Sequence, residues 1–122
     1  MFANQKRRLA ILGIAIATPY LAVTLPTAAS AADRETAAVS WTTPGAPAHV
    51  RVYLSDGEVV VERAFDGEAW YNGGLKVPGQ SASATVWVDP KPHIRVYVTD
   101  HGKIVEYCWD DNGPWRKGGF AP

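Results

Sequence analysis

The sequence predicts an all-β fold that consists of two similar sheets of four short strands. The chain repeats itself with a period of about 45 residues, which is typical of the blades of a β-propeller. Each repeat alternates β-branched or aromatic residues with polar ones. No segment combines a helical apolar period with capping residues. We therefore expect each repeat to form one four-stranded propeller blade.

The first segment of the chain is expected to direct export rather than to join the fold. The basic start Lys6-Arg7-Arg8 precedes a mostly apolar run, and Ala29-Ser30-Ala31 has the small-residue pattern of a cleavage site. Nothing after this run resembles a stop-transfer segment. We predict a secretory signal peptide over residues 1–31, no membrane anchor, and a secreted, extracellular domain over residues 32–122.

Each repeat is expected to contribute its four strands in the same order. The first strand ends in a tryptophan, and the second and third alternate apolar with polar residues. The fourth is a brief segment before a Gly-Gly pair. In the first repeat, about residues 37–79, we expect strands near 38–41, 50–54, 59–65 and 70–72; in the second, about residues 80–122, near 84–87, 94–98, 103–109 and 115–117.

Tight turns are expected between the second and third strands of each repeat. Asp56-Gly57 and Asp100-His101 have the composition of two-residue hairpin turns. These turns would place an arginine of the second strand directly opposite a glutamate of the third. The same cross-strand pair would then occur twice, as Arg51–Glu62 and as Arg95–Glu106.

The aromatic residues at the ends of the third strands are expected on the other face of each sheet. Phe65 and Trp109 each follow a glutamate by three positions, and an odd offset in a strand reverses the side-chain direction. One blade therefore cannot combine its own arginine and glutamate with its own aromatic residue. Two adjacent blades can, so the cleft between blades is the candidate site.

Self-assembly is expected because two blades are too few to close a ring. Propellers contain about four to eight blades, and an open pair would expose apolar faces and strand edges. Cys108 is the only cysteine, which excludes an intrachain disulfide as a source of stability. We expect this cysteine to be a buried, unreactive thiol. The residues alone allow two, three or four copies in a closed ring.

The composition of the cleft favours a sugar as the ligand. Guanidinium and carboxylate groups hydrogen-bond hydroxyls, and an indole packs against the C–H face of a pyranose. A surface ion pair would explain one Arg–Glu pair, but its recurrence with matching aromatic residues favours binding. Beyond residue 31 the chain has nine basic and twelve acidic residues without a basic cluster, so nucleic acid is not an expected partner.

Two other functions remain open. A glycoside hydrolase would place two unlike carboxylates at one bond, whereas each predicted cleft has one glutamate beside an arginine; we therefore predict no enzyme activity and no catalytic residue. A protein-interaction module would explain the repeats but not the recurring charges. His49 and His93, one in each blade, are not a metal-ligand set, so no metal or cofactor is expected. Asp66 and Asp110 are expected to shape turns, and Arg116 and Lys117 to be solvated.

The repeated motifs resemble a known family. The segments "RVY" and "GKIVEYCWDDNGPW", followed by "GG", are similar to those of the small bacterial fucose-binding lectins related to the Aleuria-type fungal fucose lectins. The resemblance covers both repeats, about residues 37–120. It implies a two-blade chain that forms a trimer, a six-bladed β-propeller, and binding of L-fucose and fucosylated glycans within and between chains.

The resemblance also implies which residues bind the sugar. Arginine and glutamate would bind ring hydroxyls, one tryptophan would donate its indole N–H, and another aromatic ring would pack on the sugar. The site within a chain would consist of Arg51, Glu62, Gly74, Trp109 and Trp115, with Ile94 beside the fucose methyl group. The site between chains would consist of Arg95, Glu106 and Gly119 with Val50, Phe65 and Trp70 of the neighbour. Because phenylalanine has no N–H and a smaller ring, we expect the site with Phe65 to be the weaker one.

Overall fold

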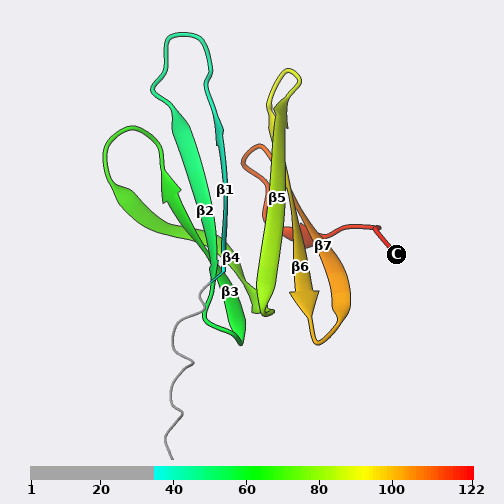
Figure 1. The fold of residues 1–122 in the computed structure, drawn as a ribbon. Coiled ribbons are helices and arrows are strands. Elements are labelled where there is room, and N and C mark those ends of the chain that lie inside the picture. Colours follow the sequence, from blue (N-terminus) through cyan, green and yellow to red (C-terminus); the bar gives the residue numbers. More distant parts are fainter. Residues whose placement is uncertain (1–34) are drawn as a thin grey trace, which may run out of the picture. The chain divides into compact units, whose positions relative to one another are not determined.

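The computed structural model describes residues 35–122, which fall within one compact unit, Asp33–Pro122. The predicted signal peptide, residues 1–31, lies outside the described residues. Eight strands form two four-stranded antiparallel sheets, which confirms the prediction of an all-β chain with two four-stranded blades (Figure 1). Between residues 35 and 122 there is no helix with the length and apolar character needed to cross a membrane.

Both sheets have their strands in sequence order. Blade 1 consists of β1 (Thr36–Trp41), β2 (His49–Ser55), β3 (Val59–Phe65) and β4 (Trp70–Pro78). Blade 2 consists of β5 (Ser81–Val88), β6 (Pro92–Asp100), β7 (Lys103–Asp110) and β8 (Arg116–Lys117). The blades lie side by side, with β1 of one next to β5 of the other (Figure 1).

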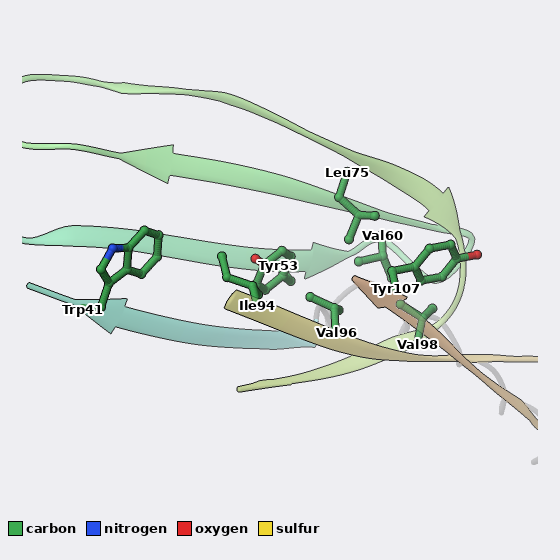
Figure 2. Packing of buried hydrophobic residues seen from close by; sticks show 8 residues of the cluster. All are labelled: Trp41, Tyr53, Val60, Leu75, Ile94, Val96, Val98 and Tyr107. Carbon is green, nitrogen blue, oxygen red and sulfur yellow. The ribbon is translucent and has the colours of Figure 1, made fainter. Parts of the chain in front are cut away.

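The core lies between the two blades, because their strands turn alternate residues inward. Between Val50 and Ser55 in β2 the odd-numbered residues are buried and the even-numbered ones are half-buried, whereas residues 94–98 in β6 show the reverse pattern. Both patterns follow from the two-residue period of a strand. Figure 2 shows the eight buried side chains that form the cluster: Trp41, Tyr53, Val60 and Leu75 from blade 1, and Ile94, Val96, Val98 and Tyr107 from blade 2.

Both hairpin turns lie one residue later than predicted. In blade 1 the central residues are Gly57 and Glu58, because the Asp56 N–H donates to the Val59 carbonyl oxygen over 3.3 Å. The Asp56 side chain accepts from the N–H groups of Glu58 and Val59, both at 2.9 Å, so the aspartate precedes the turn. Gly57 has a φ of 101°, which suits glycine at the first central position. In blade 2 the central residues are His101 and Gly102, at φ 49° and 82°.

The predicted pairing of arginine directly opposite glutamate is therefore wrong. Tyr53 faces Glu62 and Arg51 faces Ala64, and the second blade shows the same register, with Tyr97 facing Glu106 and Arg95 facing Cys108. The shift displaces the pairing by two positions, which preserves the face on which each side chain lies. Arg51 and Glu62 thus still share one face, as diagonal neighbours. The predicted opposite placement of the aromatic residues is confirmed, since Phe65 faces Val50 and Trp109 faces Ile94.

The fourth strand of blade 1 is longer than the brief segment that was predicted, whereas that of blade 2 is as short as expected. β4 extends to Pro78, whereas β8 comprises only Arg116–Lys117. The pairing of β3 with β4 shifts between Val61 and Arg63, so a bulge lies opposite Glu62. Gly73 and Gly74, which were expected to end this strand, lie in the bulge. The pairing of β3 with β4 continues beyond them to Pro78.

Candidate functional site

A cleft of about 430 Å³ opens between the two blades. It is lined by five of the six residues predicted for the site within the chain: Arg51, Glu62 and Gly74 from blade 1, and Trp109 and Trp115 from blade 2. The sixth, Ile94, has no exposed surface and lies in the core instead of lining this cleft. Tyr71, which the sequence did not indicate, also lines the cleft.

The Glu62 carboxylate is fixed by donors from both blades. The Tyr53 hydroxyl donates to Oε2 over 2.9 Å, and the Gly74 N–H donates to Oε1 over 2.9 Å. Trp115 of blade 2 donates its indole N–H to the same Oε1 over 3.2 Å. Glu62 is only 5% exposed, so these hydrogen bonds replace water at a charged group. The carboxylate is thereby oriented before any ligand arrives.

The Gly-Gly pairs have a steric role beside these carboxylates. A Cβ at Gly73 would collide with the Glu62 carboxylate, and a Cβ at Gly118 would collide with the Glu106 carboxylate. Only glycine permits such a close approach of backbone and side chain. The repetition of this contact in both blades explains why "GG" recurs.

The principal partner of Arg51 is Asp66, not Glu62. Nη1 donates to Asp66 Oδ1 over 2.9 Å and Nη2 to Oδ2 over 3.3 Å, whereas Nε lies 3.9 Å from Glu62 Oε2. The guanidinium also lies over the ring of Trp41, 5.0 Å from its centroid. The sequence interpretation assigned Asp66 to turn formation alone. The signal that could have identified it is its recurrence directly after the aromatic residue of the third strand, as Phe65-Asp66 and Trp109-Asp110.

A cluster of four residues, here called the arginine cluster, fixes the guanidinium in each blade. In both, histidine stacks on tryptophan at 16° between ring planes, with centroids 5.0 Å apart in blade 1 and 5.1 Å in blade 2. Nδ1 of the histidine lies 2.7 Å from the aspartate in blade 1 and 2.6 Å in blade 2. The members are Trp41, His49, Arg51 and Asp66 in blade 1, and Trp87, His93, Arg95 and Asp110 in blade 2. The two histidines therefore orient aspartates, and among residues 35–122 no group of three His, Cys, Asp or Glu side chains could hold a metal ion.

The aspartates of these clusters titrate below their ordinary range. Burial raises the pKa of Asp66, but hydrogen bonds from Arg51, Tyr71 and His49 outweigh it and hold this pKa at about 2. Hydrogen bonds from His93 and Arg95 likewise lower the pKa of Asp110. Burial raises the pKa of the Cys108 thiol, which is 3% exposed, in agreement with the predicted unreactive thiol.

Acid is expected to destabilise the fold through Asp66. Its pKa is lower in the folded chain, at about 2, than its ordinary 3.8, so its contribution is complete above pH 4 and is lost as the pH falls from about 4 to 2. The contribution is about 1–2 kcal/mol after a discount for the partly exposed side chain. Urea unfolding at several pH values should show this loss in the wild type. Asp66→Asn should flatten the curve in that window, and an unchanged slope would contradict this account.

The residues predicted for the site between chains lie on the two outer faces of the chain. Arg95 and Glu106 belong to the face of blade 2 that points away from blade 1, and Glu106 accepts the N–H of Phe120 over 3.3 Å. Val50 and Phe65 face each other on the outer side of blade 1, where the Phe65 ring lies 5.5 Å from that of Trp70. One chain does not bring these two groups together.

Comparison with known proteins assigns the chain to a family. A model of the fungal fucose-specific lectin family matches residues 45–121. The chain belongs to this family. A fucose-specific lectin of Aleuria aurantia is 36% identical, in an alignment that covers 70% of this chain and 29% of the fungal protein. The family is one of lectins and not of enzymes, as predicted from the single glutamate in each cleft.

Two solved structures resemble the chain. A fucose lectin from Kordia zhangzhouensis, in complex with methyl-fucoside, is 33% identical with a TM-score of 0.63, over 71% of this chain and 65% of that one. The SapL1 lectin, in complex with alpha methyl fucoside, is 39% identical with a TM-score of 0.61, over 70% of this chain and 31% of that one. The chain thus spans about a third of the Aleuria and SapL1 lectins and 65% of the Kordia lectin.

Proposed function

We propose that this lectin binds L-fucose and fucosylated glycans in the cleft between its blades. The observation that carries the proposal is that Arg51, Glu62 and Gly74 of one blade line a single cleft with Trp109 and Trp115 of the other. Two relatives of similar fold were solved with a methyl-fucoside. The chemistry agrees, because a pyranose needs planar polar groups for its hydroxyls and an aromatic face for its C–H groups.

The rigidity of the cleft supports binding. Arg51 is held by Asp66 and Trp41, and Glu62 by Tyr53 and the Gly74 N–H. Side chains that are already ordered lose little conformational entropy when a ligand binds. The Arg51 guanidinium and the Glu62 carboxylate would hydrogen-bond the vicinal hydroxyls of the sugar. Trp109 and Trp115 would pack against its apolar face.

The second part of the proposal is that copies of the chain close a ring and complete a second cleft. The outer residues of blade 1, Val50, Val52 and Leu54, are half-buried. Their repeat counterparts in blade 2, Ile94, Val96 and Val98, have no exposed surface because blade 1 covers them. The outer face of blade 1 is equally apolar, but no other blade of the same chain covers it. In the ring, the outer face of blade 2 of a neighbouring copy, which carries Arg95 and Glu106, would pack against it.

We propose three copies in this ring. The matched segment corresponds to 29% of the Aleuria lectin and 31% of the SapL1 lectin, so three such segments approximate the length of either relative. In a closed cyclic ring, a neighbouring chain covers every outer face. A trimer would contain six blades and two kinds of cleft, one within each chain and one between neighbours.

Export through residues 1–31 is a further proposal from the sequence, and N-terminal sequencing of the secreted protein, with Ala32 expected first, tests it.

The two kinds of cleft are expected to differ in affinity, and fucose titration tests this. Trp109→Ala should abolish binding at the cleft within the chain, which has the larger aromatic surface. Phe65→Ala should cause a smaller loss, because the cleft between chains has a ring without an N–H. Calorimetric titration of L-fucose into each variant measures both the affinity and the number of sites per chain. Equal losses in the two variants would contradict the difference, and no fucose binding by the wild type would overturn the proposed function.

A further inference from the structure

The chain contains the dipeptide Asn-Gly twice, once in each blade. Asn72-Gly73 lies in β4, and Asn112-Gly113 lies in the turn between β7 and β8. In such a dipeptide the glycine nitrogen can attack the side-chain carbonyl carbon of the asparagine, because glycine has no side chain to obstruct the approach. The attack requires that the two groups move toward each other. The local structure of each pair therefore decides how fast the reaction proceeds.

The turn around Asn112 leaves its side chain and the next backbone nitrogen free to approach each other. Asp111 and Asn112 have positive φ values, 38° and 64°, a conformation that asparagine tolerates better than most residues. The turn is anchored before the pair, where the Asp111 N–H donates to the Pro92 carbonyl oxygen over 3.1 Å. Within residues 35–122, neither the Asn112 amide nor the Gly113 N–H has a hydrogen-bond partner. Asn112 is also exposed, so water reaches it.

The Asn-Gly pair of blade 1 is held in place instead. Asn72 pairs with Arg63 in the ladder of β3 and β4, and Arg63 Nη1 donates to Asn72 Oδ1 over 2.5 Å. Gly73 lies so close to the Glu62 carboxylate that a Cβ would overlap it. Asn72 is exposed like Asn112, so access to water does not distinguish the two. The attack on Asn72 requires a local opening of the ladder, and the free energy of this opening slows it.

We infer that Asn112 is a site of spontaneous modification, at which asparagine converts to aspartate or isoaspartate. The Gly113 nitrogen forms a bond to Asn112 Cγ, the bond from Cγ to Nδ2 breaks, and ammonia leaves with the proton of the Gly113 N–H. Water then opens the resulting succinimide ring. Addition to Cγ breaks its bond to the Gly113 nitrogen and gives aspartate, whereas addition to the main-chain carbonyl carbon gives isoaspartate, in which Cβ has joined the main chain. Both steps need water alone.

The modified turn forms part of the wall of the proposed fucose cleft. Gly113, Pro114 and Trp115 line this cleft. Trp115 also donates its indole N–H to Glu62 Oε1 over 3.2 Å. Isoaspartate at position 112 lengthens the main chain of the turn by one carbon atom, which displaces this wall and the indole with it. We therefore expect modification to weaken fucose binding, an effect that rests on the proposed function.

Modification also changes the charge of the turn, and it does so in one kind of cleft only. Either product adds a carboxylate beside Asp111, whose own carboxylate is already paired with Lys91 over 3.2 Å. The corresponding turn of blade 1, residues 66–69, has no asparagine. The cleft between chains, to which that turn belongs in the proposed ring, would keep its affinity as the protein ages.

The modification is tested by incubation of the full chain at mildly alkaline pH in oxygen-18-labelled water, followed by digestion with trypsin and mass spectrometry. Cleavage after lysine and arginine gives peptides 64–76 and 104–116, each with one Asn-Gly pair. In the folded chain, peptide 104–116 should be modified at least about tenfold faster than peptide 64–76 and should gain one labelled oxygen. In the urea-unfolded chain the two rates should be similar. Equal rates in the folded chain, or an unmodified peptide 104–116, would overturn the site.

The effect on binding is tested with Gly113→Ala as the control variant. The added Cβ obstructs the attack, yet it would lie 3.5 Å from the Asp110 carbonyl oxygen, an ordinary contact that preserves the turn. This variant and the parent protein both carry Glu106→Ala, which leaves the cleft within the chain as the measured site, and each is titrated with methyl α-L-fucoside before and after incubation. The parent should lose affinity about three- to tenfold, as the loss of one hydrogen bond would give. Gly113→Ala should keep its own starting affinity.

The outcomes separate this inference from the proposed function. An equal decline in both proteins, or an unchanged affinity in a parent whose peptide 104–116 is modified, would overturn the effect on the cleft. A fresh parent protein that does not bind the fucoside would instead overturn the proposed function, and the peptide analysis would still decide whether Asn112 is the modified residue.

Discussion

Glu62→Ala is expected to abolish fucose binding at the cleft within the chain and to destabilise the fold. The carboxylate accepts hydrogen bonds from Tyr53, Gly74 and Trp115, and it is nearly fully buried. Its removal leaves the buried Tyr53 hydroxyl and the less buried N–H groups of Gly74 and Trp115 without this acceptor, which costs about 3 kcal/mol of unfolding free energy. The loss of two charge-assisted hydrogen bonds to the sugar corresponds to at least about a hundredfold loss of affinity. Urea unfolding and fucose titration measure the two effects.

Glu106→Ala is the matched control for this variant. Glu106 occupies the same register position in blade 2, but it lies on the outer face, where it accepts the Phe120 N–H. Its removal should abolish fucose binding at the proposed cleft between chains. It should also lower the free energy of unfolding by less than the removal of Glu62 does. Equal destabilisation by the two substitutions would show that the cross-blade hydrogen bond from Trp115 does not contribute to stability.

Leu54→Asp is expected to open the proposed ring and leave a folded single chain. Leu54 lies on the half-buried outer face of blade 1, where a charge would have to be buried against the neighbouring copy. Sedimentation should report three chains for the wild type and one for the variant. Fucose titration should show two sites per chain falling to one, because the cleft within the chain is intact.

Val98→Asp is the matched comparison inside the chain. Val98 is the repeat counterpart of Leu54, but it has no exposed surface because blade 1 already covers it. The same substitution should therefore unfold the chain instead of dissociating a ring, and circular dichroism distinguishes the two results. An assembly unchanged by Leu54→Asp would place the interface elsewhere, and a wild type that sediments as one chain would exclude the ring.

Local sequence pattern was sufficient for the number and order of the strands and for the faces on which side chains lie, but not for the length of β4. The two-residue period of Val50–Ser55 and Ile94–Val98 determines which residues share a face, and this result is unchanged when the register shifts by two positions. The placement of Phe65 on the opposite sheet face from Arg51 and Glu62 followed from the odd number of positions between Glu62 and Phe65 alone. The repeat itself made the second blade predictable from the first.

The turns and the partners of the charged groups depended on tertiary structure. Whether Asp56 or Gly57 begins the turn is decided by side-chain hydrogen bonds to the backbone, which composition does not reveal. The partner of Arg51 is Asp66 because the turn after β3 folds back onto β2, over a separation of fifteen residues. The hydrogen bond from Trp115 to Glu62 joins residues that are 53 positions apart and exists only because the blades pack together.

The sequence by itself therefore determined the strands, the two blades and the inward or outward direction of most side chains, because these depend on the short-range geometry of the backbone. The tertiary structure alone decided which carboxylate holds Arg51, the burial of Ile94 and the cleft between the two blades. These features depend on distances between segments that are far apart in the chain, and only the packing of one blade against the other sets those distances.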